Sequence, residues 1–175
     1  MERIVIIGVT GSGKSTLAKR LAEKLRYPVI ELDDLHWSPG WVAADKEVFR
    51  QTVARAASAG KWVAVGNYSI VSDLLWSRAD TLIWLDVSLP RALGRLVRRT
   101  IQRARNNEAV CNGNYETIAR AFSKDSIILW LFKSYFKKKR EFGVVFRDKN
   151  QPGIRNYVRL RTLQETESFL SLPPV

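Results

Sequence analysis

The sequence predicts an α/β protein in which helices cover both faces of a parallel β-sheet. Three observations lead to this prediction. The chain opens with a short apolar run rich in β-branched residues, Arg3–Ile7, which is typical of a buried parallel strand. A glycine-rich loop follows it at once. Strand and helix patterns then alternate to the end of the chain, as parallel sheets require.

The first part of the chain is expected to hold three strands and two helices. In the first helix, Leu17, Leu21 and Leu25 recur every four residues, so they share one face. Ala44 or Asp45 is expected to cap the second helix, and Gly60 is a natural stop for it. The expected strands are 3–7, 28–32 and 62–65, and the expected helices are 14–25 and 45–60.

The second part is expected to add two strands and three helices. Pro90 suits the first turn of an arginine-rich helix, because proline lacks the N–H that a helix start leaves unpaired. Thr162 and Glu165 have the spacing of a capping box, which predicts a last helix ending near Leu170. The expected strands are 81–85 and 157–160, residues 106–114 form a loop, and a helix covers 126–136 and stays basic through Arg140.

A complete G-x-x-x-x-G-K-[ST] pattern lies between the first strand and the first helix. In such a loop, glycines let backbone N–H groups turn toward phosphate oxygens, and the helix start adds its positive end. Lys14 is expected to reach the β- and γ-phosphates, and the Ser15 hydroxyl to contact Mg²⁺. The expected nucleotide-binding residues of the loop are Gly8, Thr10, Gly11, Ser12, Gly13, Lys14, Ser15 and Thr16.

Acidic residues follow the second strand, at the sheet edge where α/β proteins bind their ligands. Asp33 is a candidate base for the hydroxyl of a phosphate acceptor, or an outer contact to Mg²⁺. Glu31 or Asp34 can share this role, and a helix cap is the alternative. His36 is the only histidine, and packing under Trp37 is as good an interpretation as a substrate contact.

Composition limits the classes of function. The 175 residues suit one domain, and the single cysteine, Cys111, excludes an intrachain disulfide and a cysteine-based zinc site. The opening residues do not resemble a signal peptide, so the cytoplasm is the expected compartment. The longest apolar run, Ile127–Phe132, ends at Lys133, which predicts a buried helix and no membrane partner.

The net charge of +12, with an isoelectric point near 10.2, predicts an anionic partner. Nucleotide phosphates, nucleic acid and acidic surfaces all meet this requirement. The basic run Lys137–Arg140 favours nucleic acid, but we prefer to interpret it as the solvated end of a helix, because cations stabilise helix C-termini.

Several segments together resemble the adenylate-kinase-related "DNA topology modulation protein" (FlaR-like) group. The resemblance covers nearly the whole chain and implies a nucleoside-monophosphate-kinase fold with a five-stranded parallel core in the order 2-3-1-4-5. The segments that carry it are residues 8–15, 31–37, 66–69, 78–86, 112–114 and 125–128.

The resemblance also implies roles for individual residues. By this likeness Arg95 stacks on the adenine, Arg99 contacts phosphate, and Arg103 follows on the same helix face. Asn67 and Tyr68 lie where adenylate kinases contact the acceptor nucleotide, and the region 99–115 is only a short lid on the single domain 1–175. Arg161 is expected near the adenine edge, and a plain surface arginine is the alternative.

One position departs from the pattern of the group. The group reads Asp-Gly-Asn-Tyr, and that Asp helps to hold Mg²⁺, whereas this chain has Val65 there. Asp33 or Asp34 can compensate through water; otherwise Mg²⁺ binds more weakly and transfer is slow. Asp86 ends a strand like a metal-binding acid, but by the resemblance it lies too far from the phosphates.

These patterns predict an ATP- and Mg²⁺-dependent small-molecule kinase whose acceptor is a nucleotide or nucleoside. Lys14, Asp33 and Arg99 are its expected catalytic residues, and Ser15 and Asp33 its metal contacts. The spacing of Glu31, Asp33 and His36 is similar to that in gluconate kinases, so a sugar-acid acceptor stays open. An ATP-dependent DNA-binding regulator is the alternative from another class.

Overall fold

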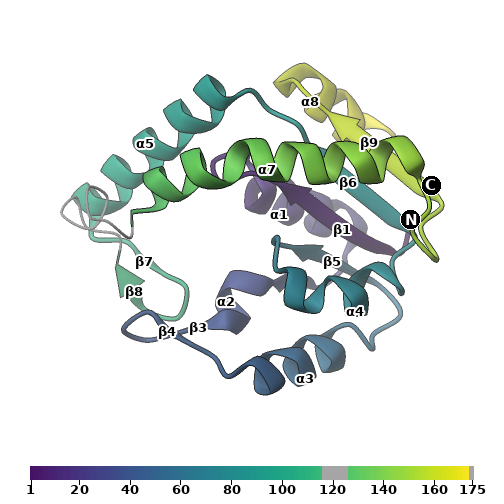
Figure 1. Cartoon of the computed structure of the whole chain (residues 1–175), viewed down its shortest axis with the longest axis horizontal. Coiled ribbons are helices and arrows are strands. Elements are labelled where there is room, and N and C mark those ends of the chain that lie inside the picture. Colours follow the sequence, from purple (N-terminus) through teal and green to yellow (C-terminus); the bar gives the residue numbers. More distant parts are fainter. Residues whose placement is uncertain (116–125, 174–175) are drawn as a thin grey trace.

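The structure is a computed structural model that describes residues 1–115 and 126–173. Its centre is a five-stranded parallel sheet in the order β2-β5-β1-β6-β9, with β1 in the middle (Figure 1). Counted along the chain as core strands, this is the order 2-3-1-4-5, so the predicted fold is confirmed. The strands are β1 (Arg3–Gly8), β2 (Val29–Glu31), β5 (Trp62–Val65), β6 (Thr81–Leu85) and β9 (Asn156–Leu160).

Alternate residues of the central strands face opposite sides of the sheet, as strand geometry requires. Ile4 and Ile6 pack toward α1 (Lys14–Leu25) and α8 (Leu163–Ser171). Val5 and Ile7 join the other core. That core includes residues of α3 (Lys46–Ala56), α4 (Ser72–Trp76) and α7 (Ile127–Asp148).

Helix α5 (Leu89–Asn106) packs against α7 in a third, smaller core beside the glycine loop. Leu96 from α5, Leu131 and Tyr135 from α7, and Val9 from the loop meet there. This core places the arginine-rich helix next to the loop, which is where the sequence places it.

The expected caps are present. Asp45 accepts hydrogen bonds from the N–H groups of Glu47 and Val48 at 2.8 and 3.2 Å, and α3 then ends at Ala56, short of Gly60. The Thr162 hydroxyl accepts from Glu165 N at 3.1 Å, and α8 follows.

Several local predictions were wrong. The second strand stops at Glu31, and residues Leu32–His36 form helix α2, because the acids there start a helical turn. The predicted loop at 106–114 contains a two-stranded hairpin, β7 (Ala109–Val110) and β8 (Asn114–Tyr115). A second hairpin, β3 (Trp37–Ser38) with β4 (Val42–Ala43), and the turn η1 (Ser69–Val71) were not predicted.

The last long helix differs most from its prediction. It continues eight residues past Arg140 to Asp148, so Lys137–Arg140 lies in mid-helix and not at its end. Lys138 pairs with Glu141 and Lys139 with Asp86, so only part of the basic run is solvated. The apolar start of this helix is not a buried segment either, because Trp130 is 59% and Phe132 45% exposed.

Candidate active site

The glycine loop joins β1 to α1 at the carboxyl edge of the sheet. Its turn depends on Gly11, which has φ +77°, and where a Cβ would lie 2.3 Å from the backbone oxygen of Ala92. Any side chain would therefore collide with α5. Gly13, also at positive φ, precedes α1, and no side chain caps the first turn of that helix. The loop and the helix start thus present backbone N–H groups suited to an anion.

Two polar groups of the loop fit a phosphate tail. The Ser12 hydroxyl is buried and has no hydrogen-bond partner within the part of the chain that the structure describes. Lys14 Nζ donates to the Val9 carbonyl at 3.0 Å, inside the loop. Burial lowers the pKa of Lys14 to about 8; nearby Asp33 opposes this shift and Arg99 adds to it. A bound phosphate would add further negative charge beside this buried ammonium group and favour its charged form.

Asn67 ties the end of β5 to the start of the glycine loop. Its Oδ1 accepts from Gly8 N at 3.3 Å, and its Nδ2 donates to the Gly8 carbonyl. The side chain that the sequence assigned to the acceptor therefore also fixes the phosphate loop. Nothing in the spacing of the two residues, 59 positions apart, indicates this contact.

Asp33 lies on the exposed side of α2 and is held by a neighbour. The Tyr68 hydroxyl donates to Asp33 Oδ1 at 2.7 Å. Burial, together with the Asp33 charge, raises the pKa of Tyr68, so this hydroxyl keeps its proton. Asp33 also acts on the pKa of Lys14, which shows that the predicted base and the predicted phosphate lysine are close enough to interact.

His36 belongs to an aromatic cluster, which supports its packing interpretation. Its ring centroid lies 4.8 Å from Trp37, 5.0 Å from Phe49 and 4.7 Å from Tyr68. Burial lowers its pKa and the nearby Asp33 charge opposes this, so the ring favours the neutral form. Trp41 extends the cluster, with its ring centroid 5.8 Å from that of Trp37.

Glu31 is the acid that lies beside Ser15, and it stands opposite the position where the resemblance expects an acid. In the β2–β5 register, Glu31 pairs with Val65. Burial, then the Asp34 charge, raises the pKa of Glu31, while hydrogen bonding by the Ser15 hydroxyl opposes the rise. Glu31 Oε1 is buried without a partner among the described residues. The neighbouring strand therefore supplies a carboxylate where Val65 supplies none.

Two arginines of α5 lie close to residues of the glycine loop. Arg95 Nη1 donates to the Ser12 carbonyl at 2.8 Å, so its guanidinium lies on the glycine loop. Arg99 is near enough to Lys14 to lower its pKa, and Arg103 opposes the rise in the pKa of Cys111. The row of arginines thus runs from the loop toward the β7–β8 hairpin.

This hairpin is attached to the segment that carries the acids. Asn112 Nδ2 donates to the carbonyls of Asp34 and Trp37 at 2.6 and 2.8 Å. The buried Asn114 donates to Ser38 O at 3.0 Å and accepts from Trp41 N at 2.7 Å. The predicted lid therefore contacts the acid-bearing side of the site directly, through two asparagine side chains.

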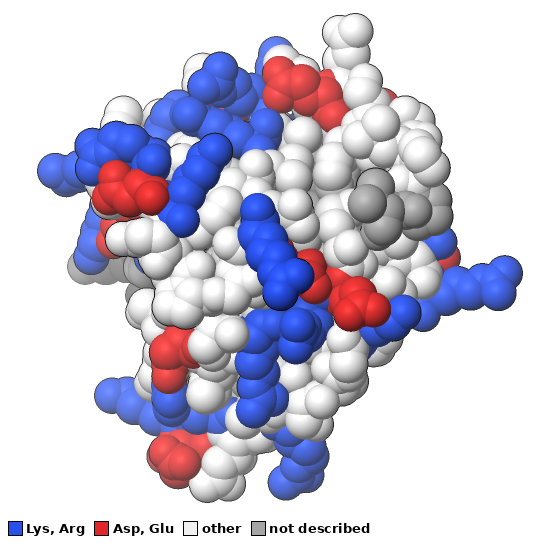
Figure 2. All heavy atoms as spheres, turned by 90° about the vertical axis from the view of Figure 1, so that its right-hand side faces the viewer, with Lys and Arg blue, Asp and Glu red and all other residues white. Residues whose placement is uncertain are grey.

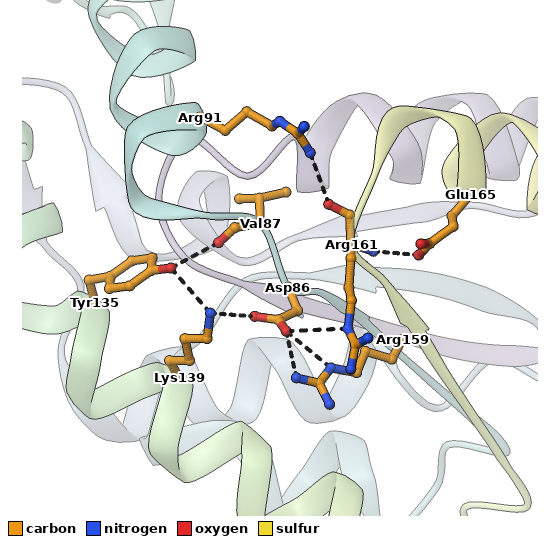
Figure 3. Close-up of polar contacts among 8 residues, drawn as sticks. All are labelled: Asp86, Val87, Arg91, Tyr135, Lys139, Arg159, Arg161 and Glu165. Carbon is orange, nitrogen blue, oxygen red and sulfur yellow. Dashed lines mark hydrogen bonds and ion pairs between the residues drawn. The ribbon is translucent and has the colours of Figure 1, made fainter.

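Asp86 is surrounded by cations (Figure 3). Its carboxylate, 6% exposed, lies 2.6 Å from Arg159 Nη2, 3.4 Å from Lys139 Nζ and 4.0 Å from Arg161 Nε. The Tyr135 hydroxyl is next to Lys139 and donates to the Val87 carbonyl. Asp86 thus joins β6, β9 and α7, which supports leaving it out of the metal site. Arg161, which follows β9, lies beside Asp86, and its side chain is 60% exposed.

The sequence interpretation missed a cavity of about 130 Å³ beside Asn67 and Tyr68. It lies between the sheet, the η1–α4 segment and α7, and no single motif marks it, because its walls come from distant parts of the chain. The lining includes Leu32, Gly66, Asn67, Tyr68, Ser69, Trp76, Lys138, Glu141 and Phe142.

Among residues 1–115 and 126–173, no group of three or more His, Cys, Asp or Glu side chains is arranged to hold a metal ion by itself. Within the same ranges, no helix is long and apolar enough to span a bilayer.

Comparison with known proteins agrees with this geometry. A curated shikimate kinase of Synechococcus elongatus is 35% identical over 53% of this chain and 56% of its own length. A probable gluconokinase of Schizosaccharomyces pombe is 59% identical over 18% of this chain and 17% of its own length. The chain thus aligns with little more than half of the shikimate kinases that it matches.

Solved kinases share the fold. A shikimate kinase from Bacteroides thetaiotaomicron aligns with 97% of this chain and 94% of its own, at TM-score 0.55 and 18% identity. A gluconokinase from Sinorhizobium meliloti aligns with 97% of this chain and 91% of its own, at TM-score 0.51 and 17% identity. A family model described as an AAA domain matches residues 4–113, which is more than half of the chain. The chain belongs to this AAA domain family.

Proposed function

We propose that this protein transfers the γ-phosphate of ATP to a hydroxyl group of a small molecule. The observation that carries the proposal is that a phosphate loop and a carboxylate lie together at one edge of the sheet. Lys14 lies in the loop, and Asp33 is close enough to raise the pKa of Lys14. Shikimate kinases and gluconokinases among its relatives carry out ATP-dependent transfer to small molecules, which supports this reading.

Most of the predicted residues have a task in this proposal. The backbone of residues 8–13 and Lys14 hold the β- and γ-phosphates, and Arg95 and Arg99 add cations along them. Asp33 accepts the proton of the acceptor hydroxyl, and the Tyr68 hydroxyl orients its carboxylate. Asp34, Asn67 and Arg103 line the acceptor side, and His36 supports it from the aromatic cluster.

Magnesium fits this site. Ser15 and Glu31 are adjacent, and the buried Glu31 Oε1, which has no hydrogen-bond partner among the described residues, is suited to accept a bond from a metal-bound water. When bound with ATP, the ion neutralises charge between the β- and γ-phosphates. Asp33 would face the same ion through water. We therefore assign to Glu31 the metal-side role that Val65 cannot fill.

Two acceptor classes have support. The ring faces around His36 and Tyr68 suit a nucleoside base, as the resemblance to the topology modulation group implies. The names of the relatives, and the spacing of Glu31, Asp33 and His36, favour a sugar acid or a related hydroxy acid. ADP release, measured over nucleosides, nucleoside monophosphates, gluconate and shikimate, separates the two classes. Intact ATP binding without turnover on any of them would count heavily against a kinase.

The geometry gives less support to a DNA-binding function. On the face shown in Figure 2, lysines and arginines are interspersed with acids and uncharged residues. DNA affinity measured against salt tests this alternative, because phosphate contacts give a steep salt dependence. A flat response would remove it.

A further inference from the structure

The outward side of α7 combines exposed aromatic side chains with cations. Phe136 is 70%, Trp130 59% and Phe132 45% exposed. Every exposed Trp or Phe in the described part of the chain lies on this helix. The opposite side of α7 carries the buried Leu131, Tyr135, Phe142 and Phe146, so the exposed rings are not needed for the core.

Helical spacing places these side chains in neighbouring rows. Leu129, Phe132 and Phe136 follow one another at intervals of three and four, and so share a face. Lys133, Lys137 and Arg140 form the adjoining row, again at intervals of four and three. All three cations are exposed, and no ion pair joins them to a carboxylate of the described residues. We call these six residues and Trp130 the α7 face.

We propose that the α7 face binds the surface of an anionic membrane. Exposed Trp, Phe and Leu beside Lys and Arg are the combination that lets a helix lie in the interface, with rings at the acyl boundary and cations on lipid phosphates. Charge complementarity selects the anionic surface. This inference goes beyond the proposed kinase function and does not depend on it.

Other occupants fit the α7 face less well. A second copy of the chain would bring two sets of three cations together, which like-charge repulsion opposes. A single-stranded nucleic acid is bound in a basic groove with stacking rings, whereas these residues project from one convex helix, and the described cavity beside α7 is lined by its other side. Leu129, with no ring face, suits lipid better than bases.

The absence of a spanning helix does not conflict with this proposal. The sequence predicted no membrane partner because its longest apolar run is too short to cross a bilayer. A helix that lies on the surface needs only an exposed apolar row, and the tertiary structure leaves that row uncovered on α7.

The test is co-sedimentation of the full chain with two kinds of vesicle, phosphatidylcholine alone and phosphatidylcholine mixed with phosphatidylserine. We expect binding to the mixed vesicles only. Trp130→Ser with Phe136→Ser should weaken it at least about tenfold. Lys133→Gln, Lys137→Gln and Arg140→Gln together should weaken it about a hundredfold, at about fivefold per cation.

Matched controls change exposed residues elsewhere in the chain. Val48→Ser with Leu163→Ser replaces side chains that are 57% and 60% exposed. Lys19→Gln, Lys46→Gln and Arg55→Gln together remove three exposed charges. Both controls should bind mixed vesicles like the parent chain, and all variants should still bind ATP, which reports that they fold.

Three results would overturn the proposal. The parent chain fails to sediment with the mixed vesicles, or the α7 variants bind them as well as the controls do. In the third, the α7 variants lose affinity for a labelled single-stranded oligonucleotide and keep their affinity for vesicles, which would assign this face to nucleic acid. None of these results bears on ATP binding or phosphate transfer, so failure here is distinct from failure of the proposed kinase function.

Discussion

At the scale of single residues, the candidate site depends on a few charges whose neighbours are known. Lys14 lies inside the glycine loop, Asp33 interacts with it, and Glu31 stands beside Ser15. Each of these side chains has a task that one measurement can separate from the others.

Binding of ATP should depend on pH through Lys14. Burial lowers its pKa to about 8, so the free protein loses this positive charge as pH rises through that value. Bound phosphate favours the charged form, so binding takes up a proton and ATP affinity falls above pH about 8. Calorimetry in buffers of different ionisation enthalpy measures the uptake. Lys14→Ala should abolish ATP affinity, whereas Lys19→Ala should not change it.

Asp33→Asn should separate ATP binding from transfer. The amide has the same shape but cannot take the acceptor proton, so we expect transfer to fall about a hundredfold or more while ATP affinity changes little. Tyr68→Phe removes only the bond that orients Asp33, and its effect should be smaller. The measurements are ADP release and nucleotide calorimetry. Full activity of Asp33→Asn would exclude it as the base.

The effect of Mg²⁺ on ATP affinity should depend on the Glu31 carboxylate. Glu31→Gln should reduce the gain in ATP affinity that Mg²⁺ brings and leave metal-free binding intact. Glu23→Gln, which removes an exposed carboxylate of α1 outside the site, is the matched control. Calorimetry with and without Mg²⁺ measures both. If Glu31→Gln keeps the full Mg²⁺ effect, the carboxylate beside Ser15 has no part in holding the ion.

Val65→Asp tests the same site from the neighbouring strand. Restoring the acid should strengthen Mg²⁺-dependent ATP binding, although Val65 is only 3% exposed and packs on the α1 side of the sheet. Burying an unpaired carboxylate there should lower the free energy of unfolding by about 3–5 kcal/mol. Urea unfolding measures this cost, and unchanged Mg²⁺ binding would show that the position does not face the metal.

At the scale of elements, the β7–β8 hairpin lies in the region 99–115 that the sequence expects to form a lid, and asparagine side chains attach it to the segment 34–41. Asn114 is 3% exposed and bonds to the backbone of Ser38, Trp41 and Cys111. Because these contacts join the lid to the acid-bearing segment, loss of the side chain should affect stability and acceptor binding together.

Asn114→Ala should leave buried backbone groups unpaired and lower the free energy of unfolding by about 1–3 kcal/mol. It should also raise the KM for the acceptor more than the KM for ATP, because the contacts lie on the acid side of the site. Asn107→Ala, at the end of α5, is a control outside these bonds. Equal effects of the two substitutions on the acceptor KM would contradict the attachment.

At the scale of the whole molecule, Asp86 holds the sheet to the long helix. It is nearly buried, and its cations come from β9, the residue after β9, and α7. Arg159 also stacks on Trp84, with its guanidinium carbon 4.4 Å from the ring centroid. Asp86→Asn would leave these cations without their shared partner.

We therefore expect Asp86→Asn to lower the free energy of unfolding by about 3 kcal/mol. Asp73→Asn breaks an exposed pair with Arg50, and its effect should be much smaller, because solvent screens such pairs. Urea unfolding of both variants, with ATP calorimetry on the folded proteins, measures the difference. Equal stability of the two variants would mean that Asp86 adds no more to stability than an exposed ion pair does, because water solvates the cations around it equally well.

Local sequence patterns were sufficient to predict much of the fold. The glycine pattern, the buried strand before it and the capping residues Asp45 and Thr162 depend on near neighbours in the chain, so the sequence by itself determined the phosphate loop, the five core strands and most helix starts. The sequence also indicated Asp33 and the α5 arginines as candidate site residues, because they follow strands whose carboxyl ends meet at one sheet edge.

Only the tertiary structure decided which side chains meet across long separations. The bonds of Asn67 to Gly8 and of Asn112 and Asn114 to residues 34–41, and the register of Glu31 on Val65, join positions that no local pattern relates. The exposed rows of α7 likewise depend on what packs against that helix. Periodicity tells which residues share a face, but burial of that face is decided by the rest of the fold, and this is why the sequence placed Trp130 and Phe132 in the core.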